Sequence, residues 1–482
     1  MPSAYSLLAL AALPAVVVSA PFSNSPLSKR ASSNQIFSPP SSSPTSASAN
    51  YVGANNATLP KTSVVSGKSF DRIVQIWLEN TDAAVASTTP AFQKLAAQGL
   101  TLSSYYAVTH PSEPNYIASV AGDFFGLSDD AFYHVPENIT TVFDLLDDGG
   151  KAAKPISYAC YQENMPYDGY TGFNYTSKNY ITPGAKDYAY YQRKHNPCAI
   201  MDYVSGDKTR ALRNRNFNDF AADVNAGVLP QWVFITPNMV NDGHDTGPAF
   251  FSNWTDYFLT PLLTNKNFND DKTLVLLTFD ENDSYNDPNQ IMTIALGGAL
   301  PKNLVSKADD TYLTHYSAIS TVEANWELKN LGRGDVNKTM SNVFPWVAQT
   351  VGYTNVQVAE EDRPMTNLTG LFAGPFSSTR YQPFTAPTDQ NAKGAGGQGV
   401  LLKPSLNKSY TLASAPAPVN LTANHQTNPY SSDPGFDNSK LSVSSQTSTS
   451  SSKSGAASFT KPSALSAISA TALLAIGASL LL

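Results

Sequence analysis

The chain has 482 residues, with 31 lysines and arginines against 38 aspartates and glutamates, which gives a formal net charge of −7. This acidic balance, without a basic run longer than two residues, argues against nucleic acid as a standing partner. The middle of the chain is rich in apolar and aromatic runs and is long enough to form one large core. The two ends differ from it in composition.

The N-terminal end predicts export. Residues 1–20 combine a polar start with an apolar run and end in Val-Ser-Ala, as in a secretory signal peptide. Residues 21–66 are rich in serine, asparagine and proline, and we interpret them as a propeptide or a disordered, loosely packed segment. The dibasic pair Lys29-Arg30 indicates either a processing site or an ordinary exposed pair of charges.

The C-terminal end predicts attachment to a surface. Residues 431–458 are rich in serine and threonine, which is typical of a glycosylated stalk. Residues 455–482 contain small residues, a spacer and an uncharged apolar tail, the order of a GPI-anchor signal, and no basic flank follows as it would after a transmembrane span. We therefore expect an extracellular protein, either secreted or held at the membrane or cell wall through the anchor.

Sequons for N-glycosylation are frequent, as expected of an extracellular glycoprotein. They lie at Asn56, Asn138, Asn174, Asn253, Asn337, Asn367, Asn407 and Asn420. A further sequon at Asn282 falls inside a motif assigned below to the site, where a glycan would block access, so we expect Asn282 to be unmodified.

The chain has two cysteines, Cys160 and Cys198. In an oxidising compartment the default for such a pair is a disulfide, whereas a two-thiolate metal site is disfavoured because no CxxC spacing is present. A bridge would brace the segment that carries Lys194 and His195.

Three short apolar runs predict buried strands, at 72–78, 232–236 and 273–279. The segments 90–98, 142–146 and 216–225 have helical spacing. Strands that alternate with helices predict an α/β fold, with a mostly parallel sheet between two layers of helices. We assign 67–355 to this catalytic domain and 356–430 to a C-terminal extension packed on or beside it.

Polar motifs follow the three strands. Glu79, Asn238 and Asp280 each fall just beyond a strand's carboxyl end, where open α/β sheets collect their ligand sites. Carboxylates together with imidazoles and a hydroxyl suit a divalent metal that polarises a phosphoryl oxygen. Each motif alone is equally typical of a solvated loop.

The run HPSEPNY, residues 110–116, places Ser112 between two prolines at a predicted helix start. A serine there is most often a helix cap, which is the interpretation that spacing alone favours. The alternative is a nucleophile at a phosphate-binding helix N-terminus. His110 is expected to buttress the turn.

Taken together, the motifs resemble a known family. WLEN (77–80), SEPNYIASVAG (112–122), TPNMVNDGHDT (236–246), FDEND (279–283) and THYS (314–317) resemble segments of the fungal secreted acid phosphatases. These belong to the phosphoesterase family, which includes bacterial phospholipase C enzymes and lies within the alkaline-phosphatase-like superfamily. The resemblance covers about 69–353 and implies a three-layer αβα sandwich.

The resemblance also implies roles for individual residues. Ser112 is the implied nucleophile, Asn115 a donor to the phosphoryl oxygen, and Asn80 and Lys194 bind substrate. His244, His315 and His195 are the candidates for protonating the leaving group. The implied metal ligands are Glu79, Ser112, Asp280, Glu281 and Asn238. Two-zinc relatives have Asp and His in place of Asn238 and Glu281, so we expect one divalent ion of unspecified identity.

The predicted function is the hydrolysis of small phosphate monoesters in two steps through a phosphoserine. A phospholipase C-type phosphodiesterase is the nearest alternative, because the same motifs serve both reactions. A GPI-anchored cell-wall glycoprotein with a vestigial site is the alternative from another class.

Overall fold

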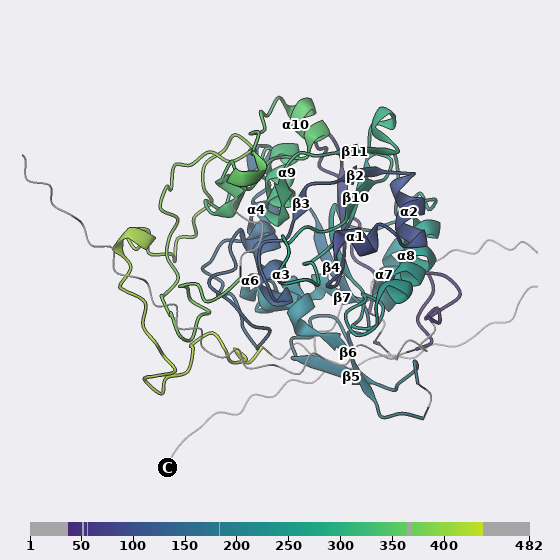
Figure 1. The fold of residues 1–482 in the computed structure, drawn as a ribbon, viewed down its shortest axis with the longest axis horizontal. Coiled ribbons are helices and arrows are strands. Elements are labelled where there is room, and N and C mark those ends of the chain that lie inside the picture. The colour runs from purple at the N-terminus through teal and green to yellow at the C-terminus, as the bar shows by residue number, and fades with distance from the viewer. Residues whose placement is uncertain (1–36, 51–52, 55, 183, 364–368, 437–482) are drawn as a thin grey trace, which may run out of the picture. The chain divides into compact units, whose positions relative to one another are not determined.

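The computed structural model describes residues 37–50, 53–54, 56–182, 184–363 and 369–436 (Figure 1). The expected signal peptide, the Lys29-Arg30 pair, nearly all of the expected stalk and the anchor signal lie outside these residues. None of the helices within the described ranges is both long and apolar enough to cross a membrane.

An eight-stranded sheet is at the centre of the described residues (Figure 1). Its order is β11-β2-β10-β9-β1-β8-β4-β7, and β10 alone runs antiparallel to its neighbours. The strands are β1 (Arg72–Leu78), β2 (Leu100–Leu102), β4 (Tyr158–Gln162), β7 (Asn214–Asn216), β8 (Trp232–Thr236), β9 (Thr273–Phe279), β10 (Thr293–Leu296) and β11 (Lys307–Asp309). Two small sheets pair β3 (Tyr105–Tyr106) with β12 (Leu313–Thr314) and β5 (Asn174–Ser177) with β6 (Tyr188–Gln192).

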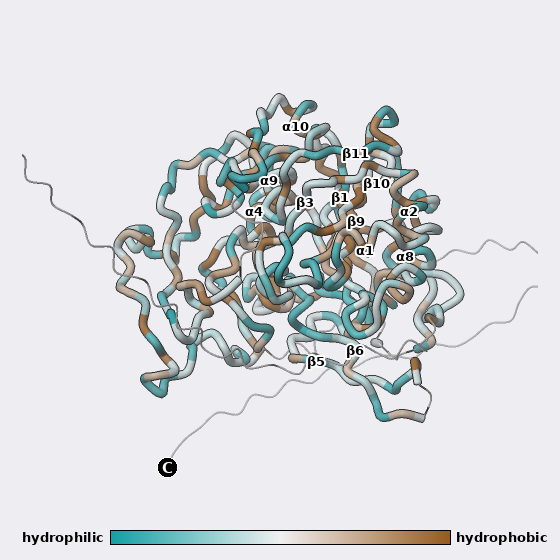
Figure 2. The backbone as a smooth tube through the Cα atoms, in the orientation of Figure 1, coloured by the Kyte–Doolittle hydropathy of each residue, from teal (hydrophilic) through white to brown (hydrophobic). Residues whose placement is uncertain are grey.

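The three predicted strands are confirmed and lie side by side as β9, β1 and β8. β8 and β9 are buried throughout, and β1 is buried except at Arg72. Continuous burial is what a parallel sheet covered on both faces requires, and it explains why these strands read as unbroken apolar runs. Figure 2 shows hydrophobic backbone segments gathered along these central strands.

Helices cover both faces of the sheet. Trp77 of β1 packs on Tyr116 of α3 (Ser112–Ala121) and His315 of α9 (His315–Trp326). The next residue, Leu78, pairs in register with Phe279, and Phe279 packs on the opposite face against Phe92 of α2 (Pro90–Ala96) and Phe251 of α8 (Pro248–Leu262). Successive side chains of a strand point to opposite faces, so these contacts define two helical layers. The predicted three-layer α/β fold is confirmed.

The helices that the prediction placed at 90–98, 142–146 and 216–225 are present with ends shifted by at most two residues. The helices are α1 (Ala83–Ala86), α2 (Pro90–Ala96), α3 (Ser112–Ala121), α4 (Val142–Asp148), α5 (Pro197–Ile200), α6 (Asp202–Ser205), α7 (Phe217–Ala226), α8 (Pro248–Leu262), α9 (His315–Trp326) and α10 (Pro345–Val351). A short 3-10 turn, η2 (Arg193–His195), precedes α5.

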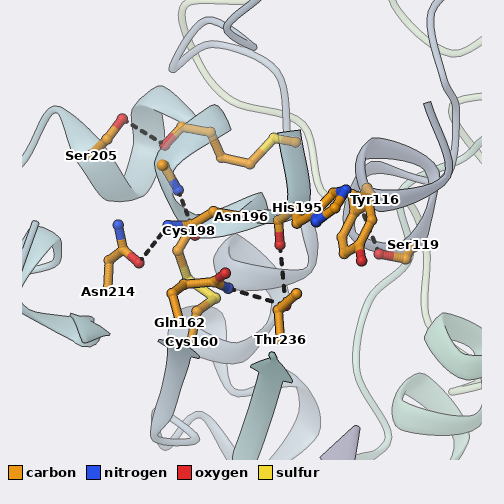
Figure 3. The surroundings of a disulfide bond; sticks show 12 residues. Tyr116, Ser119, Cys160, Gln162, His195, Asn196, Cys198, Ser205, Asn214 and Thr236 are labelled. Atoms are coloured by element: carbon orange, nitrogen blue, oxygen red, sulfur yellow. Dashed lines mark hydrogen bonds between the residues drawn. A yellow bond between two sulfur atoms is a disulfide. The ribbon is translucent and has the colours of Figure 1, made fainter. Parts of the chain in front are cut away.

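The predicted disulfide is present between Cys160 of β4 and Cys198 of α5 (Figure 3). Its sequence separation of 38 residues corresponds to a stabilisation of about 4 kcal/mol in the chain-entropy model. The carbonyl of His195 accepts a hydrogen bond from Thr236 Oγ1 at 3.1 Å. The bridge and this bond attach the η2 segment to the ends of β4 and β8.

The segment before β1 differs from the loosely packed stretch expected over 21–66. Phe37 packs on Phe250 of α8 with ring centroids 5.6 Å apart. The backbone amides of Asn56 and Leu59 donate to carboxylates of α7, and Val65 exchanges two hydrogen bonds with the Gln231 side chain. Its few apolar residues suggested disorder, but buried polar bonds hold the described part of it in place.

The segment before β1 is hydrogen-bonded to a buried cluster of charged side chains. Arg215 Nη1 and Nε lie 2.7 and 2.8 Å from Asp168 and Asp223, and Nη2 lies 3.6 Å from Asp219. All four side chains are at most 1% exposed. Three carboxylates would carry more negative charge than one guanidinium can balance. Burial and the neighbouring charge of Asp168 therefore raise the pKa of Asp219 to about 9.

Residues 369–436 pack on the catalytic domain largely without regular structure. Phe376, 1% exposed, packs edge-on against Phe125 at 5.8 Å. Asn330 and Val400 form an isolated β-bridge, as do Ala386 and Thr411. Residues 369–436 thus cover the end of α3 that is remote from Ser112.

We expect the ionisation of Asp219 to lower the stability of the fold as the pH rises. Asp219 ionises near pH 3.9 when unfolded but at about 9 in the fold. Its contribution to stability is therefore complete below about pH 4 and is lost as the pH rises toward 9. Asp219→Asn should reduce the fall in unfolding free energy between about pH 5 and about pH 8, which urea unfolding at the two pH values measures. Asp271→Asn, at a side chain 96% exposed, is the control. An unchanged slope in Asp219→Asn would contradict the assignment.

Candidate functional site

The predicted polar residues meet where three neighbouring strands end. Glu79 follows β1, Asp280 follows β9, and the loop that carries Asp242 and His244 follows β8. The Glu79 amide donates to the Asp242 carbonyl at 3.1 Å, and the Asp280 amide donates to the Leu78 carbonyl at 3.0 Å. Because β1 lies between β8 and β9, the strand order alone brings these carboxylates together.

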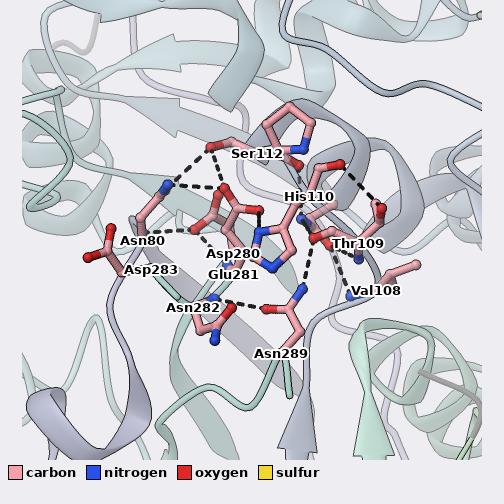
Figure 4. Close-up of polar contacts among 12 residues, drawn as sticks. Asn80, Val108, Thr109, His110, Ser112, Asp280, Glu281, Asn282, Asp283 and Asn289 are labelled. Atoms are coloured by element: carbon pink, nitrogen blue, oxygen red, sulfur yellow. Dashed lines mark hydrogen bonds and ion pairs between the residues drawn. The ribbon is translucent and has the colours of Figure 1, made fainter. Parts of the chain in front are cut away.

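Ser112 is the first residue of α3 and is 1% exposed. Its hydroxyl donates to Glu79 Oε2 at 3.0 Å. Its Oγ also lies 3.4 Å from both Asn80 Oδ1 and Glu281 Oε1 (Figure 4). A hydroxyl has a single proton, so it cannot donate to three acceptors at once. The surplus of oxygen ligands around Ser112 is suited to a cation.

The carboxyl groups around Ser112 are fully buried. Burial together with neighbouring carboxylates raises the pKa of Asp280 and of Glu281 well above the usual range. Asp280 Oδ2 is buried without a hydrogen-bond partner among the described residues. Buried charges are normally paired or coordinated to metal. The donor set Glu79, Asn80, Ser112, Asp280 and Glu281 therefore fits a hard divalent cation, which prefers such oxygen ligands.

The other carboxylate oxygen of Glu79 faces a second group of side chains. Oε1 accepts a hydrogen bond from Tyr116 and lies 3.2 Å from His195 Nε2, while His195 Nδ1 lies 3.5 Å from Asp242 Oδ2. Figure 3 shows His195 beside the stacked ring of Tyr116. Glu79, His195 and Asp242 each offer a ligand atom within 4.8 Å of the others. They form a second donor set that shares Glu79 with the first.

The electrostatics of this second set favour a charged Glu79. Burial would raise the pKa of Glu79, but the charges of His195 and Lys194 outweigh it and hold the pKa below the usual range. Burial and the charge of Glu79 raise the pKa of Asp242. The sequence interpretation missed Asp242, although the residue lies in the same run as Asn238 and His244.

His110 is a further residue whose role the sequence interpretation understated. Its Nδ1 lies 2.5 Å from Glu281 Oε2, and its ring stacks on Tyr285. Burial lowers the pKa of His110 to about 4, so the imidazole is neutral. The HPSEPNY run therefore supplies both Ser112 and the partner of Glu281.

Lys194 and His244 form the polar side of the site opposite the carboxylates. Lys194 Nζ donates to Asp130 Oδ2 at 3.0 Å and lies 3.3 Å from His244 Nε2. His244 Nδ1 lies 2.7 Å from Asp245 Oδ1. If Lys194 donates to Nε2, the His244 proton lies on Nδ1 and points to Asp245. Burial opposes the charge of Lys194, but Asp130 and Glu79 together keep its pKa above the usual value.

Asn238 is close to the site, but its side chain is occupied elsewhere. Its Oδ1 accepts from the amides of Val240 and Asn241, and its Nδ2 donates to Asn164 and Tyr180. These bonds use the amide group to shape the loop after β8. The predicted role of Asn238 as a metal ligand therefore has no support in the geometry, and Asp242 has the better placement.

Two other predicted catalytic residues also have structural partners. Asn115 accepts from the amides of Val108 and Thr109 and donates to the carbonyls of Thr109 and Pro111. It thus holds the turn before Ser112 and has no proton left for a phosphoryl oxygen. His315, fully buried, lies with Nε2 2.6 Å from the Asp280 carbonyl. It supports the loop after β9 from behind instead of facing the leaving group.

The asparagines of the predicted glycosylation sites differ in how exposed they are. Those at Asn174, Asn253, Asn337, Asn407 and Asn420 are exposed, Asn56 and Asn138 are half-buried, and Asn367 lies outside the described residues. Asn282 is 2% exposed, and its Nδ2 donates to the carbonyls of Ser284 and Pro288. Attachment of a glycan would break both bonds.

Comparisons with known proteins show to which family the chain is related. The phosphoesterase family model matches residues 77–329. The acid phosphatase of Aspergillus fumigatus is 43% identical over 344 residues, covering 70% of this chain and 72% of that protein. The phosphate-repressible acid phosphatase of Penicillium chrysogenum is 41% identical over 377 residues, covering 77% and 86%. A solved alkaline phosphatase superfamily protein from Vibrio parahaemolyticus is 14% identical with a TM-score of 0.34, covering 61% and 72%.

Asn282 is expected to carry no glycan in the native protein. Glycopeptide mapping should find Asn253 and Asn337 modified and Asn282 bare, because the Asn282 side chain is buried and bonded. Full occupancy of Asn282 in active protein would contradict the assignment of this loop to the site.

Proposed function

The chain belongs to the phosphoesterase family and is a phosphoric ester hydrolase, and from this premise we propose that it is an acid phosphatase that cleaves phosphate monoesters through Ser112. One observation carries the proposal: the Ser112 hydroxyl is at a helix N-terminus, hydrogen-bonded to Glu79 and within 3.4 Å of Asn80 and Glu281. A serine that only capped the helix would bond a backbone amide of its first turn. Here the N-cap position is taken by Pro111, and the hydroxyl of Ser112, the first residue inside α3, is directed to Glu79 Oε2.

In the first step Ser112 Oγ attacks phosphorus as the bond to the leaving oxygen breaks, and the serine proton passes to Glu79 Oε2, the group that already accepts it. The product is a phosphoserine. In the second step water attacks phosphorus, phosphate leaves, and the proton returns to Oγ.

Lys194 and the N-terminus of α3 would stabilise the negative charge of the substrate. The Lys194 ammonium is held beside the site by Asp130 and would pair with a phosphoryl oxygen. The N-terminus of the ten-residue helix α3 adds the positive end of its dipole at the reacting oxygen. Asp130 also accepts the Glu113 amide at 2.9 Å, so one carboxylate orients both elements.

His244 is the best placed of the three candidate acids. His315 Nε2 is engaged with the Asp280 carbonyl, and His195 lies between Glu79 and Asp242. The His244 side chain is 19% exposed and is oriented by Asp245, as a general acid requires. In this role His244 carries a second proton on Nε2, in place of the Lys194 contact, and passes it to the leaving oxygen. The same nitrogen then removes a proton from water in the second step.

One divalent ion completes the proposed site. The residues that would hold it are Glu79, Asn80, Ser112, Asp280 and Glu281, with His195 and Asp242 as the second donor set beside them. Such an ion polarises a phosphoryl oxygen and favours the ionised form of the serine.

An extracellular location, secreted or at the cell surface, is the second part of the proposal. The buried Cys160–Cys198 disulfide and the exposed sequons support it, because disulfides persist in oxidising compartments.

Ser112→Ala should abolish turnover of a soluble monoester to below about one hundredth of wild type. Ser119→Ala is the matched control, since Ser119 is a buried serine of the same helix whose hydroxyl donates to the Tyr116 carbonyl. It should remain active. Residual Ser112→Ala activity above that limit, in folded protein, would exclude Ser112 as the nucleophile.

Elemental analysis of purified protein should find about one equivalent of a divalent ion per chain. Glu79→Gln should remove it, because Glu79 belongs to both donor sets. Glu163→Gln, a change at another buried glutamate that accepts from the Asn238 amide, should retain the metal. Fully active wild-type protein without bound metal would refute this part of the proposal.

A further inference from the structure

We propose that Tyr285 forms a wall of the leaving-group subsite and that the enzyme prefers phosphate monoesters whose leaving group is a planar aromatic ring. This inference rests on the proposed function and specifies the substrate class of the same site.

Tyr285 is connected to the nucleophile by a short series of contacts. Its ring stacks on His110, with centroids 4.0 Å apart and planes at 26°. His110 contacts Glu281 at 2.5 Å, and Glu281 lies 3.4 Å from Ser112 Oγ. Figure 4 shows how His110, Glu281 and Ser112 lie next to one another. The tyrosine ring is therefore next to the groups that surround the reacting phosphorus.

The ring is nevertheless open to solvent. Among the described residues, Phe173 and Tyr285 are the aromatic side chains that count as exposed, at 45% and 49%. One face of the ring is used against His110, and the exposed part of the side chain lies beside these polar groups. It provides a flat apolar contact for the part of the substrate that projects away from the phosphate.

The loop that carries Tyr285 is firmly held. Asp82 accepts hydrogen bonds from the amides of Asp283 and Ser284, both at 2.9 Å, and from Ser284 Oγ at 2.6 Å. Asn282 bonds two carbonyls within the same loop. A platform that is already ordered loses little conformational entropy when a ligand binds.

The tyrosine itself is neutral. Burial of the phenol, followed by the charges of Glu281 and Asp130, raises the pKa of Tyr285. The ring therefore stays uncharged at acidic and neutral pH. An uncharged aromatic ring of the substrate can stack on it without desolvation of a charge.

The test compares benzyl phosphate with cyclohexylmethyl phosphate, which are alike in size and in the reactivity of the leaving alcohol but differ in planarity. We expect wild-type enzyme to show a kcat/KM about three- to tenfold higher for the benzyl ester. Tyr285→Phe should keep this ratio and Tyr285→Ala should bring it close to one. Inhibition by inorganic phosphate, which has no leaving group, should change little.

The ratio separates stacking from structural damage, because a displaced His110 would slow both esters alike. Phe173→Ala is the matched control and should keep the wild-type ratio. The inference is overturned if wild type shows no preference, if Tyr285→Ala keeps it, or if Phe173→Ala removes it. Hydrolysis of neither ester by folded wild-type enzyme would refute the proposed function itself.

Discussion

The site depends on the position of one carboxylate, that of Glu79. One of its oxygens accepts the Ser112 hydroxyl, and the other faces Tyr116 and His195. Glu79 has this position because β1 is a central strand, in register with β8 on one side and β9 on the other. A parallel sheet ends its strands at one edge, so Asp242 and Asp280 are brought to Glu79 by the same ladders of backbone hydrogen bonds. The acid cluster is thus a product of the strand order.

The sequence was informative where a residue's environment is set by its own neighbours in the chain. β1, β8 and β9 were predicted to the residue because strands buried on both faces must be apolar throughout. Ser112 and the acids after the strands could be predicted to share an edge of the sheet, because open α/β sheets collect their ligand sites at the carboxyl ends of the strands. The bonds that determine their roles join segments far apart in the chain, such as Ser112 to Glu79 and His110 to Glu281.

The three predicted roles that the geometry does not favour have a common physical origin. Asn238 lies in a loop, and Asn115 and His315 lie in the first turns of α3 and α9, where backbone groups of the preceding or neighbouring loops need partners. Their side chains bond to those groups, and no sequence pattern distinguishes such a residue from a ligand. Asp242 was missed because its contact with His195 joins segments that are far apart in the chain. The packing of the described residues between 37 and 66 was missed because it relies largely on hydrogen bonds to buried polar side chains.

The fold contains two groups of buried acids that are compensated in different ways. Around Arg215 the compensating cation is a side chain with a permanent charge, which lies 2.7 to 3.6 Å from all three carboxyls. Around Ser112 the cationic side chain, Lys194, pairs with Asp130. Asp168 Oδ1 in the first group and Asp280 Oδ2 in the second are both buried without a hydrogen-bond partner among the described residues. The two groups therefore differ in the cation that compensates them and not in whether every oxygen is paired.

The attachment of the segment before β1 to α7 has a consequence for how the chain folds. Asn56 bonds to Asp219 across 163 residues, so on a ribosome this segment emerges long before its partner exists. Contacts between such distant parts of a chain form slowly, because a large loop must close first. Docking of the segment is therefore expected to be a late event in folding, and until then Asp219 and Asp223 lack the hydrogen bonds that the Asn56 and Leu59 amides donate to them. The first part of the domain to be made is among the last to be ordered.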